Sequence, residues 1–163
     1  MSSELRVDKI IPTSGVPSNG GGGVIQVVSA STTTDFSTNS TSYVDITGLT
    51  VNITPKFSTS KIYVTMQGGR FGMYSNAGYY SEIQLVRDST ALTSGQPSHR
   101  GSNNNGNATG QGALSFLDSP ATTSQITYKA QVKSSSSSGT VYPTNSGTGL
   151  TITAMEISAY CQN

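Results

Sequence analysis

The chain has 163 residues, of which 33% are hydrophobic and 10% are charged, and its formal net charge is +1. A chain of this length can bury the core of one domain. Its near-neutral charge gives little attraction for nucleic acid or for an anionic membrane surface. Because low hydrophobicity favours disorder only together with high net charge, the composition predicts a folded protein with a polar, uncharged surface. No run approaches the roughly 20 apolar residues of a membrane span. We therefore expect that the protein neither binds nucleic acid nor inserts into a membrane.

The first segment, ELRVDKIIPTSGVPSNGGGGVIQV at residues 4–27, changes character along its length. A charged and apolar stretch is followed by two prolines, then by four consecutive glycines at 20–23, and only then by a strand-like run. Glycine-rich runs behave as flexible tethers. The pattern therefore predicts an N-terminal anchoring arm and linker over residues 1–23 and one folded domain over residues 24–163.

Within this arm, the side chains alternate in the way an extended peptide needs. Leu5 and Val7 would lie on one side, and Arg6 and Asp8 on the other. Such a peptide can bind by adding a strand to the open sheet edge of a partner, or it can be a frayed terminus that packs on its own domain. The first hypothesis makes the following residues the candidate anchor: Leu5, Arg6, Val7, Asp8, Lys9, Ile10 and Ile11.

From residue 24 onward, apolar residues recur at every second position, which is typical of strands that bury one face. The clearest example is residues 125–133, where Ile126, Tyr128, Ala130 and Val132 share one face. Eight or nine short strands with no crossover helix predict an all-β fold, an antiparallel jelly-roll sandwich. The expected strands are residues 24–29, 43–46, 49–54, 61–67, 79–87, 112–117, 125–133, 140–142 and 150–160.

The last predicted strand is apolar on both faces. Leu150 and Ile152 lie on one face, whereas Met155, Ile157 and Ala159 lie on the other. A single sandwich offers one core, so either a bulge near Met155 shifts the register or the outer face packs against another subunit. The second interpretation makes Met155, Ile157 and Ala159 a candidate oligomer interface.

Residues that could perform catalysis are few and scattered. His99 is the only histidine, and it falls in a polar stretch, residues 94–110, that we expect to be a long loop. The eight carboxylates occur singly, and no phosphate-binding loop, calcium loop or nucleophile elbow is present. We therefore expect a protein that is not an enzyme, with no catalytic, cofactor-binding or metal-binding residues and no cofactor.

An aromatic cluster between residues 71 and 80 allows two interpretations. It can form a core strand followed by a turn, or a surface platform for a sugar or a protein, because tyrosine joins an apolar ring to a hydroxyl. The second interpretation gives a candidate ligand or host contact made of Tyr74, Tyr79, Tyr80, His99 and Arg100.

The opening stretch, with its VDKI and glycine run, resembles the start of small structural proteins of tailed phages, marine ones in particular. The stretches STSYVDITGLTVNITPKFSTSKIYVTMQG and SGTVYPTNSGTGLTITAMEISAYC are similar to fibre-type β-domains that resemble tumour-necrosis-factor-like and complement-C1q-like heads. The resemblance spans nearly the whole chain.

This resemblance implies a non-enzymatic virion protein, a homotrimer on the outer surface of a phage particle that is made in the host cytoplasm and attached through its N-terminal arm. Its partners would be itself, another capsid or tail protein, and a host-surface glycan or protein. The chain has no shaft repeats, which favours a capsid decoration or head fibre. The alternative is a short tail fibre or spike that contacts host glycans or proteins.

Overall fold

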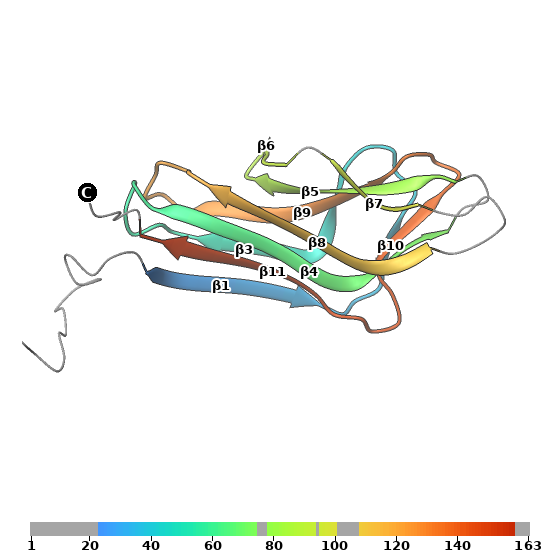
Figure 1. Cartoon of the computed structure of the whole chain (residues 1–163), viewed down its shortest axis with the longest axis horizontal. Helices are drawn as coiled ribbons and strands as arrows, with labels where there is room; N and C mark the ends of the chain where they lie inside the picture. Colours follow the sequence, from blue (N-terminus) through green and yellow to red (C-terminus); the bar gives the residue numbers. More distant parts are fainter. Residues whose placement is uncertain (1–22, 75–77, 94, 101–107, 159–163) are drawn as a thin grey trace, which may run out of the picture.

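The computed structural model describes residues 23–74, 78–93, 95–100 and 108–158. Within these ranges the chain is all-β, with eleven strands and no helix (Figure 1). The strands are β1 (Val24–Thr32), β2 (Phe36–Thr38), β3 (Val44–Ile53), β4 (Lys61–Tyr74), β5 (Tyr80–Arg87), β6 (Thr90–Ala91), β7 (Gln96–Arg100), β8 (Ala108–Asp118), β9 (Ile126–Ser134), β10 (Thr140–Thr144) and β11 (Leu150–Ile157).

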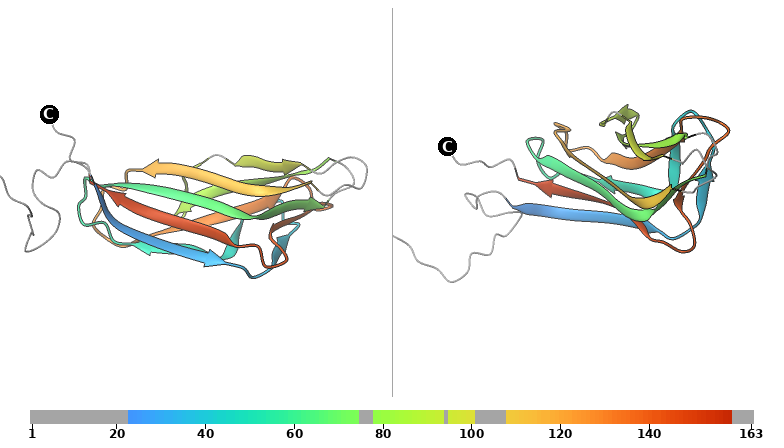
Figure 2. Two further views of the ribbon diagram at one scale, coloured as in Figure 1. Left: turned by 60° about the horizontal axis from the view of Figure 1, so that its bottom comes forward. Right: turned by 45° about the vertical axis from the view of Figure 1, so that its right-hand side comes forward.

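The strands form two antiparallel sheets packed face to face (Figure 2). One sheet has the order β1–β11–β4–β10–β2, with β8 also paired to β4, and the other has the order β3–β9–β5–β6, with β7 also paired to β5. Eight of these strands thus run β1–β11–β4–β8 and β3–β9–β5–β7, in which successive strands wind between the sheets as they do in a jelly roll. The predicted fold class is confirmed, and β2, β6 and β7 are strands that the sequence did not predict.

The core lies between the two sheets, on the faces that the alternation predicted. Ile62, Val64 and Met66 of β4 are fully buried, and they belong to one cluster with Tyr128 and Ala130 of β9. Burying alternate residues of each strand is the main apolar contribution to stability, at about 25 cal/mol for each Å² removed from water. The aromatic cluster follows its core interpretation in part, because Phe71 and Met73 are also fully buried.

The predicted loop at residues 94–110 is wrong in its first and last parts. Backbone atoms of β7 pair with β5 from Tyr80 to Ile83, and β8 already begins at Ala108. The edge of β5 needs hydrogen-bond partners, and β7 supplies them although its residues lack apolar alternation. The two strands expected between residues 43 and 54 are a single strand, β3, interrupted at Gly48, which has a φ of 83°.

β4 changes partners at two glycines. It pairs with β11 as far as Gly68 and with β10 from Gly72 onward, while β8 runs along its other edge. Gly68 and Gly69 have φ values of 102° and 70°, a backbone region that glycine adopts readily. A Cβ atom on Gly69 would lie 2.5 Å from the carbonyl oxygen of Pro143. This glycine step, Gly68 and Gly69, allows one long strand to pair with two shorter strands in succession along the same edge.

Candidate functional site

The two ends of the sandwich differ in what they join. β1 begins at Val24, which pairs with Ile157 near the close of β11, and we name this the arm end because residues 1–23 are joined to the domain there. β2 and β10 lie toward the opposite end of the molecule, which we name the far end (Figures 1 and 2). Side chains that could bind a partner occur at both ends.

An apolar row crosses the outer face of the first sheet at the arm end. Val27 pairs with Met155, Met155 with Tyr63, and Tyr63 with Leu117, so one residue from each of β1, β11, β4 and β8 lies in a line. Val27 and Leu117 are 54% and 52% exposed. Together with their neighbours these residues form the outer patch: Val24, Val27, Tyr63, Leu117, Met155 and Ile157.

Two of the three predicted interface residues, Met155 and Ile157, belong to the outer patch, and both are half-buried. Ala159 lies outside the described residues. Pairing between β11 and β4 runs without a shift from Leu150 to Ile157, and the irregularity on the other side of β11 lies in β1, between Val24 and Gln26. The burial of β11 itself alternates without a break. A bulge near Met155 therefore does not explain the two apolar faces of β11. The apolar residues on the outer face of β11 remain partly exposed, and a partner could cover them.

Apart from one lysine, the surroundings of the outer patch are uncharged. The next outward row along the sheet is Ser29, Thr153, Thr65 and Ser115, all of them hydroxyl residues. The nearest cation in the register is Lys61, which pairs with Ile157 at the margin, and its Nζ donates to Ser119 Oγ at 2.7 Å. The patch therefore presents apolar and hydroxyl groups to a partner.

Beneath this surface, the neighbouring inward row buries two carboxylates. Gln26 pairs with Glu156, Glu156 with Ile62, and Ile62 with Asp118. Glu156 is fully buried and accepts hydrogen bonds from the Gln26 side chain and, at 2.7 Å, from the backbone N–H of Lys56. It thus fixes the segment after β3 to β1 and β11.

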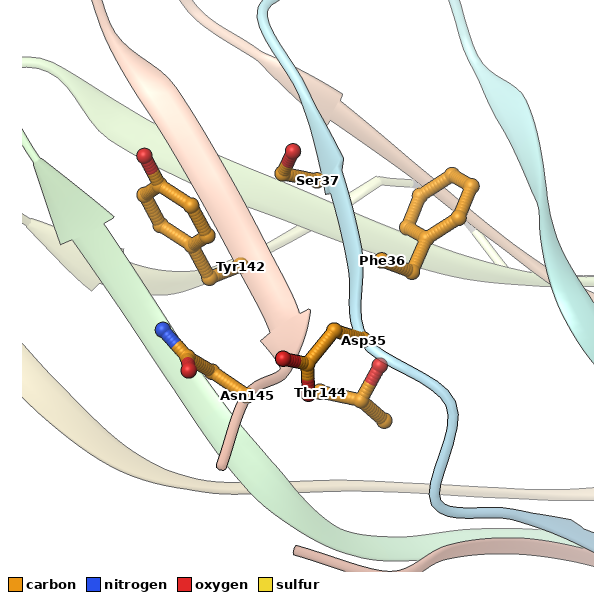
Figure 3. Close-up of a pocket in the computed structure, with 6 residues that line it drawn as sticks. All are labelled: Asp35, Phe36, Ser37, Tyr142, Thr144 and Asn145. Carbon is orange, nitrogen blue, oxygen red and sulfur yellow. The ribbon is translucent and has the colours of Figure 1, made fainter. Parts of the chain in front are cut away.

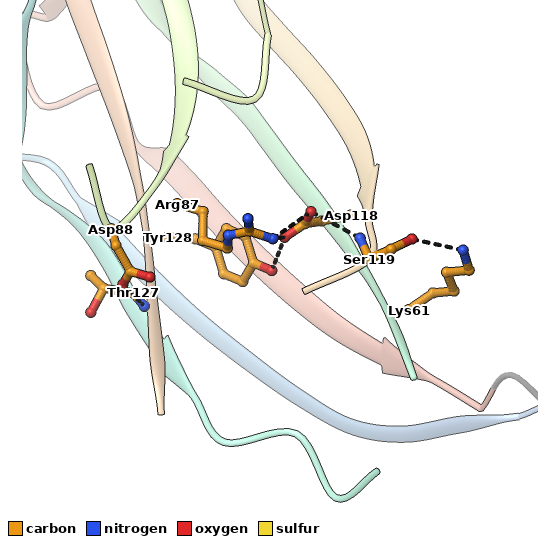
Figure 4. A network of polar contacts seen from close by, with 7 residues as sticks. All are labelled: Lys61, Arg87, Asp88, Asp118, Ser119, Thr127 and Tyr128. Carbon is orange, nitrogen blue, oxygen red and sulfur yellow. Dashed lines mark hydrogen bonds and ion pairs between the residues drawn. The ribbon is translucent and has the colours of Figure 1, made fainter. Parts of the chain in front are cut away.

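The second buried carboxylate joins the two sheets (Figure 4). Asp118 of β8 accepts hydrogen bonds from Arg87 Nη1 at 2.8 Å, from the Tyr128 hydroxyl at 2.6 Å and from the backbone N–H of Ser119 at 2.8 Å. Burial, and then the hydrogen bond to Asp118, raise the pKa of Tyr128 far above its ordinary value. The Asp118 carboxylate is thus fully engaged by groups of the same chain, which indicates that its role is structural.

The outer face of the second sheet is, by contrast, covered with paired charges. Lys129 contacts Asp45 at 2.9 Å, and Lys133 contacts Glu82 at 3.2 Å. Burial opposes ionisation of Asp45, but hydrogen bonds from Gln131 and Lys129 outweigh it and lower its pKa. Burial and the hydrogen bond to Glu82 raise the pKa of Tyr43. This face already satisfies its own polar groups.

The predicted ligand-contact residues are distributed as follows. Tyr80 is 38% exposed, whereas Tyr79 is half-buried and packs against the core. The backbone of β7 pairs His99 with Ser81 and Arg100 with Tyr80. The side chains of Tyr74, His99 and Arg100, like the predicted anchor Leu5, Arg6, Val7, Asp8, Lys9, Ile10 and Ile11, lie outside the described part of the chain.

Among the described residues, no group of three or more His, Cys, Asp or Glu side chains is placed to hold a metal ion. In the same residues, no helix is long and apolar enough to cross a membrane.

No family model matches the chain, and a search of curated proteins finds no match. Solved structures of infectious bursal disease virus align with 94% of the chain. They are the Gx strain (12% identity, TM-score 0.43, 44% of that chain), the Gt strain (12%, 0.42, 46%) and a T13 viral particle (10%, 0.41, 43%). The chain thus spans less than half of each matched chain. At these TM-scores, function must be argued from the residues of the chain itself.

Proposed function

We propose that the chain is a non-enzymatic structural protein of a tailed-phage virion, a homotrimeric appendage on the outer surface of the particle. The observation that carries the proposal is the position of the outer patch at the arm end. Two further points support it, the similarity of the sequence to phage structural proteins and the jelly-roll order of the strands. The capsid is the proposed place of attachment, through residues 1–23.

The outer patch suits contact between identical copies. In a symmetric oligomer the same residues of each copy meet at or around the axis, so a charged face would bring like charges together. The outer patch has apolar side chains bordered by hydroxyls, with one lysine, Lys61, at its margin. Burying Val27 and Leu117 would remove apolar area from water. The outer face of the second sheet lacks this property, because Lys129, Asp45 and Glu82 occupy it.

Self-association through the outer patch would also gather the arms. Residues 1–23 continue directly into Val24, which is part of the patch. A trimer would therefore present three arms at one end, and linked weak contacts bind far more tightly than one contact alone. The proposed interface and the proposed anchor thus support each other.

Sedimentation equilibrium tests the interface. We expect the wild-type chain to sediment at about three times its mass of 16.9 kDa, and Met155→Glu to sediment as a monomer, because the added carboxylates would meet in the apolar contact. Thr50→Glu is the matched control, since it adds the same charge to the outer face of the other sheet beside Lys129. A monomeric wild type, or a trimeric Met155→Glu, would contradict the proposal.

Deletion of residues 1–22 tests the anchor. The shortened chain should still form trimers but should no longer be incorporated into phage particles, as measured by quantitative mass spectrometry of purified virions. If it is incorporated at the wild-type level, the arm is not the anchor. The same measurement places the wild type on the particle, because hundreds of copies fit a capsid decoration and roughly 3 to 36 fit a tail appendage, given closed symmetry with trimers.

A further inference from the structure

A small open pocket lies at the far end, between β2 and β10 (Figure 3). Its volume is about 140 Å³. Asp35 and Ser37 are exposed beside β10, and Tyr142 is half-buried. The pocket is lined by Asp35, Phe36, Ser37, Tyr142, Thr144 and Asn145.

Four polar groups in this pocket have no hydrogen-bond partner among the described residues: the Asp35 carboxylate, the hydroxyls of Ser37 and Tyr142, and the amide nitrogen of Asn145. The oxygen of the same amide accepts from Ser146 Oγ at 2.9 Å, which leaves the nitrogen to face the pocket, as Figure 3 shows. Thr144 differs, because its hydroxyl donates to the carbonyl of Thr34 at 2.7 Å and fixes the segment before β2 to β10. The pocket therefore holds a mixed set of donors and acceptors that the fold does not use.

This set excludes several classes of ligand. An anion would meet the Asp35 carboxylate, with no lysine or arginine in the lining. A metal ion such as Ca²⁺ requires six to eight oxygen ligands, whereas the pocket supplies one carboxylate and an amide donor. An apolar ligand would desolvate the hydroxyls of Ser37 and Tyr142 without giving them partners, which is unfavourable.

A neutral sugar matches the set. Each sugar hydroxyl both donates and accepts, so it can pair with a carboxylate, with an amide N–H and with a protein hydroxyl at the same time. The carbon face of a pyranose ring can pack on an aromatic ring such as that of Tyr142, which offers an apolar surface next to a hydroxyl. We propose that the pocket between β2 and β10 binds a single neutral pyranose ring, with Asp35, Ser37, Tyr142 and Asn145 as the hydrogen-bonding residues.

The position of the pocket separates it from the outer patch. The nine residues of β1 lie between Val24 and the segment that leads into Asp35, which at roughly 3.3 Å per residue is about 30 Å. A chain attached at its arm end would thus present the pocket away from its attachment. The proposal does not depend on the proposed function, since sugar binding can be measured on the isolated protein.

Titration of the ¹⁵N-labelled full chain with single monosaccharides tests the proposal. The probes are D-glucose, D-galactose, D-mannose, L-rhamnose and N-acetyl-D-glucosamine. For at least one of them we expect amide shifts confined to residues 33–38 and 142–146, with a dissociation constant of about 1 mM, the order reached by a ligand of this size. Asp35→Asn and Tyr142→Phe should each weaken binding about tenfold, and the matched hydroxyl control Ser115→Ala, on the same sheet at the arm end, should bind as the wild type does.

Three results would overturn the proposal. The first is the absence of saturable shifts with all five sugars. The second is binding that survives in Asp35→Asn and Tyr142→Phe but is lost in Tyr80→Phe, which would place the sugar beside β7 instead. The third is binding of tetramethylammonium at the pocket that is saturable and tighter than that of any of the sugars, which would make Asp35 and Tyr142 a site for organic cations. Proton spectra of each variant establish that it is folded, so a loss of binding reports on the pocket.

Discussion

The arm end and the far end use carboxylates in opposite ways. At the arm end, Asp118 and Glu156 are buried and each accepts several hydrogen bonds from other parts of the chain. At the far end, Asp35 is exposed and has no partner among the described residues. A buried charge is tolerated only when it is paired, so the arm-end pair must maintain the fold, whereas the far-end carboxylate is available to a ligand. The comparison predicts a gradient of effects on stability.

The largest effect is expected for Asp118→Ala. This substitution leaves Arg87 and the hydroxyl of Tyr128 without their partner between the sheets. Breaking a buried ion pair by removing one member costs about 3–5 kcal/mol, and because Arg87 is partly exposed we expect the lower value. Urea unfolding would measure this loss as a lower midpoint. Asp35→Ala, which removes a carboxylate at the other end, is the control. Equal losses in the two variants would abolish the distinction between the ends.

A smaller loss is expected for Glu156→Ala, about 2 kcal/mol, because two N–H groups that it binds belong to the partly exposed segment after β3 and can partly rehydrate. The change should also be local. Amide hydrogen exchange at Lys56 and Phe57 should accelerate, while exchange in β9 should stay as in the wild type. Uniform acceleration across both sheets would mean that Glu156 does not act by fixing this segment.

Tyr128→Phe isolates one bond of the Asp118 network. The ring stays in the core, and only the hydroxyl that donates to Asp118 at 2.6 Å is lost. A hydrogen bond to a charged group contributes about 1.5–3 kcal/mol, and Arg87 and Ser119 remain bound to Asp118, so we expect the lower value. Thermal unfolding followed by circular dichroism would detect it. An unchanged midpoint of thermal unfolding would show that the hydrogen bond from Tyr128 to Asp118 does not stabilise the contact between the two sheets.

The smallest effect is expected at the far end. Tyr142→Phe and Ser37→Ala remove hydroxyls that bind no described residue, and surface substitutions of this kind stay within about 0.5 kcal/mol. The same denaturation measurement applies. A loss comparable with that of Tyr128→Phe would mean that these hydroxyls are structural, and it would remove the basis for the proposed sugar site.

The fold was largely predictable from the sequence because its signal is local. Alternation within a strand identifies the inward face, as Ile126 and Tyr128 show, and it also separated Met155 from Ile152. β7 was missed because its sequence, Gln-Pro-Ser-His-Arg, carries no such alternation and pairs only to complete the edge of β5. The predicted oligomer interface and N-terminal anchor remain predictions.

The candidate sites were less predictable because they depend on register between distant segments. Glu156 and Asp118 were interpreted as isolated carboxylates, yet Ile62 pairs with both. The outer patch likewise joins Val27 to Leu117 through two intervening strands, and the far-end pocket joins Asp35 to Tyr142. No spacing along one chain encodes these neighbours, since each depends on which strands pair and in which register.

The glycine step in β4 makes the two ends separable units of variation. Along one edge, the part of β4 before Gly68 determines the register of β11 and thereby of β1, and the part after Gly69 determines that of β10 and β2. Along its other edge, β8 pairs with both parts. Residues 33–38 and 139–146 at the far end can thus be replaced together without changing how Leu150–Ile157 pairs with β4 at the arm end. New binding specificities can therefore be introduced at the far end while the strand pairing of the arm end is left unchanged.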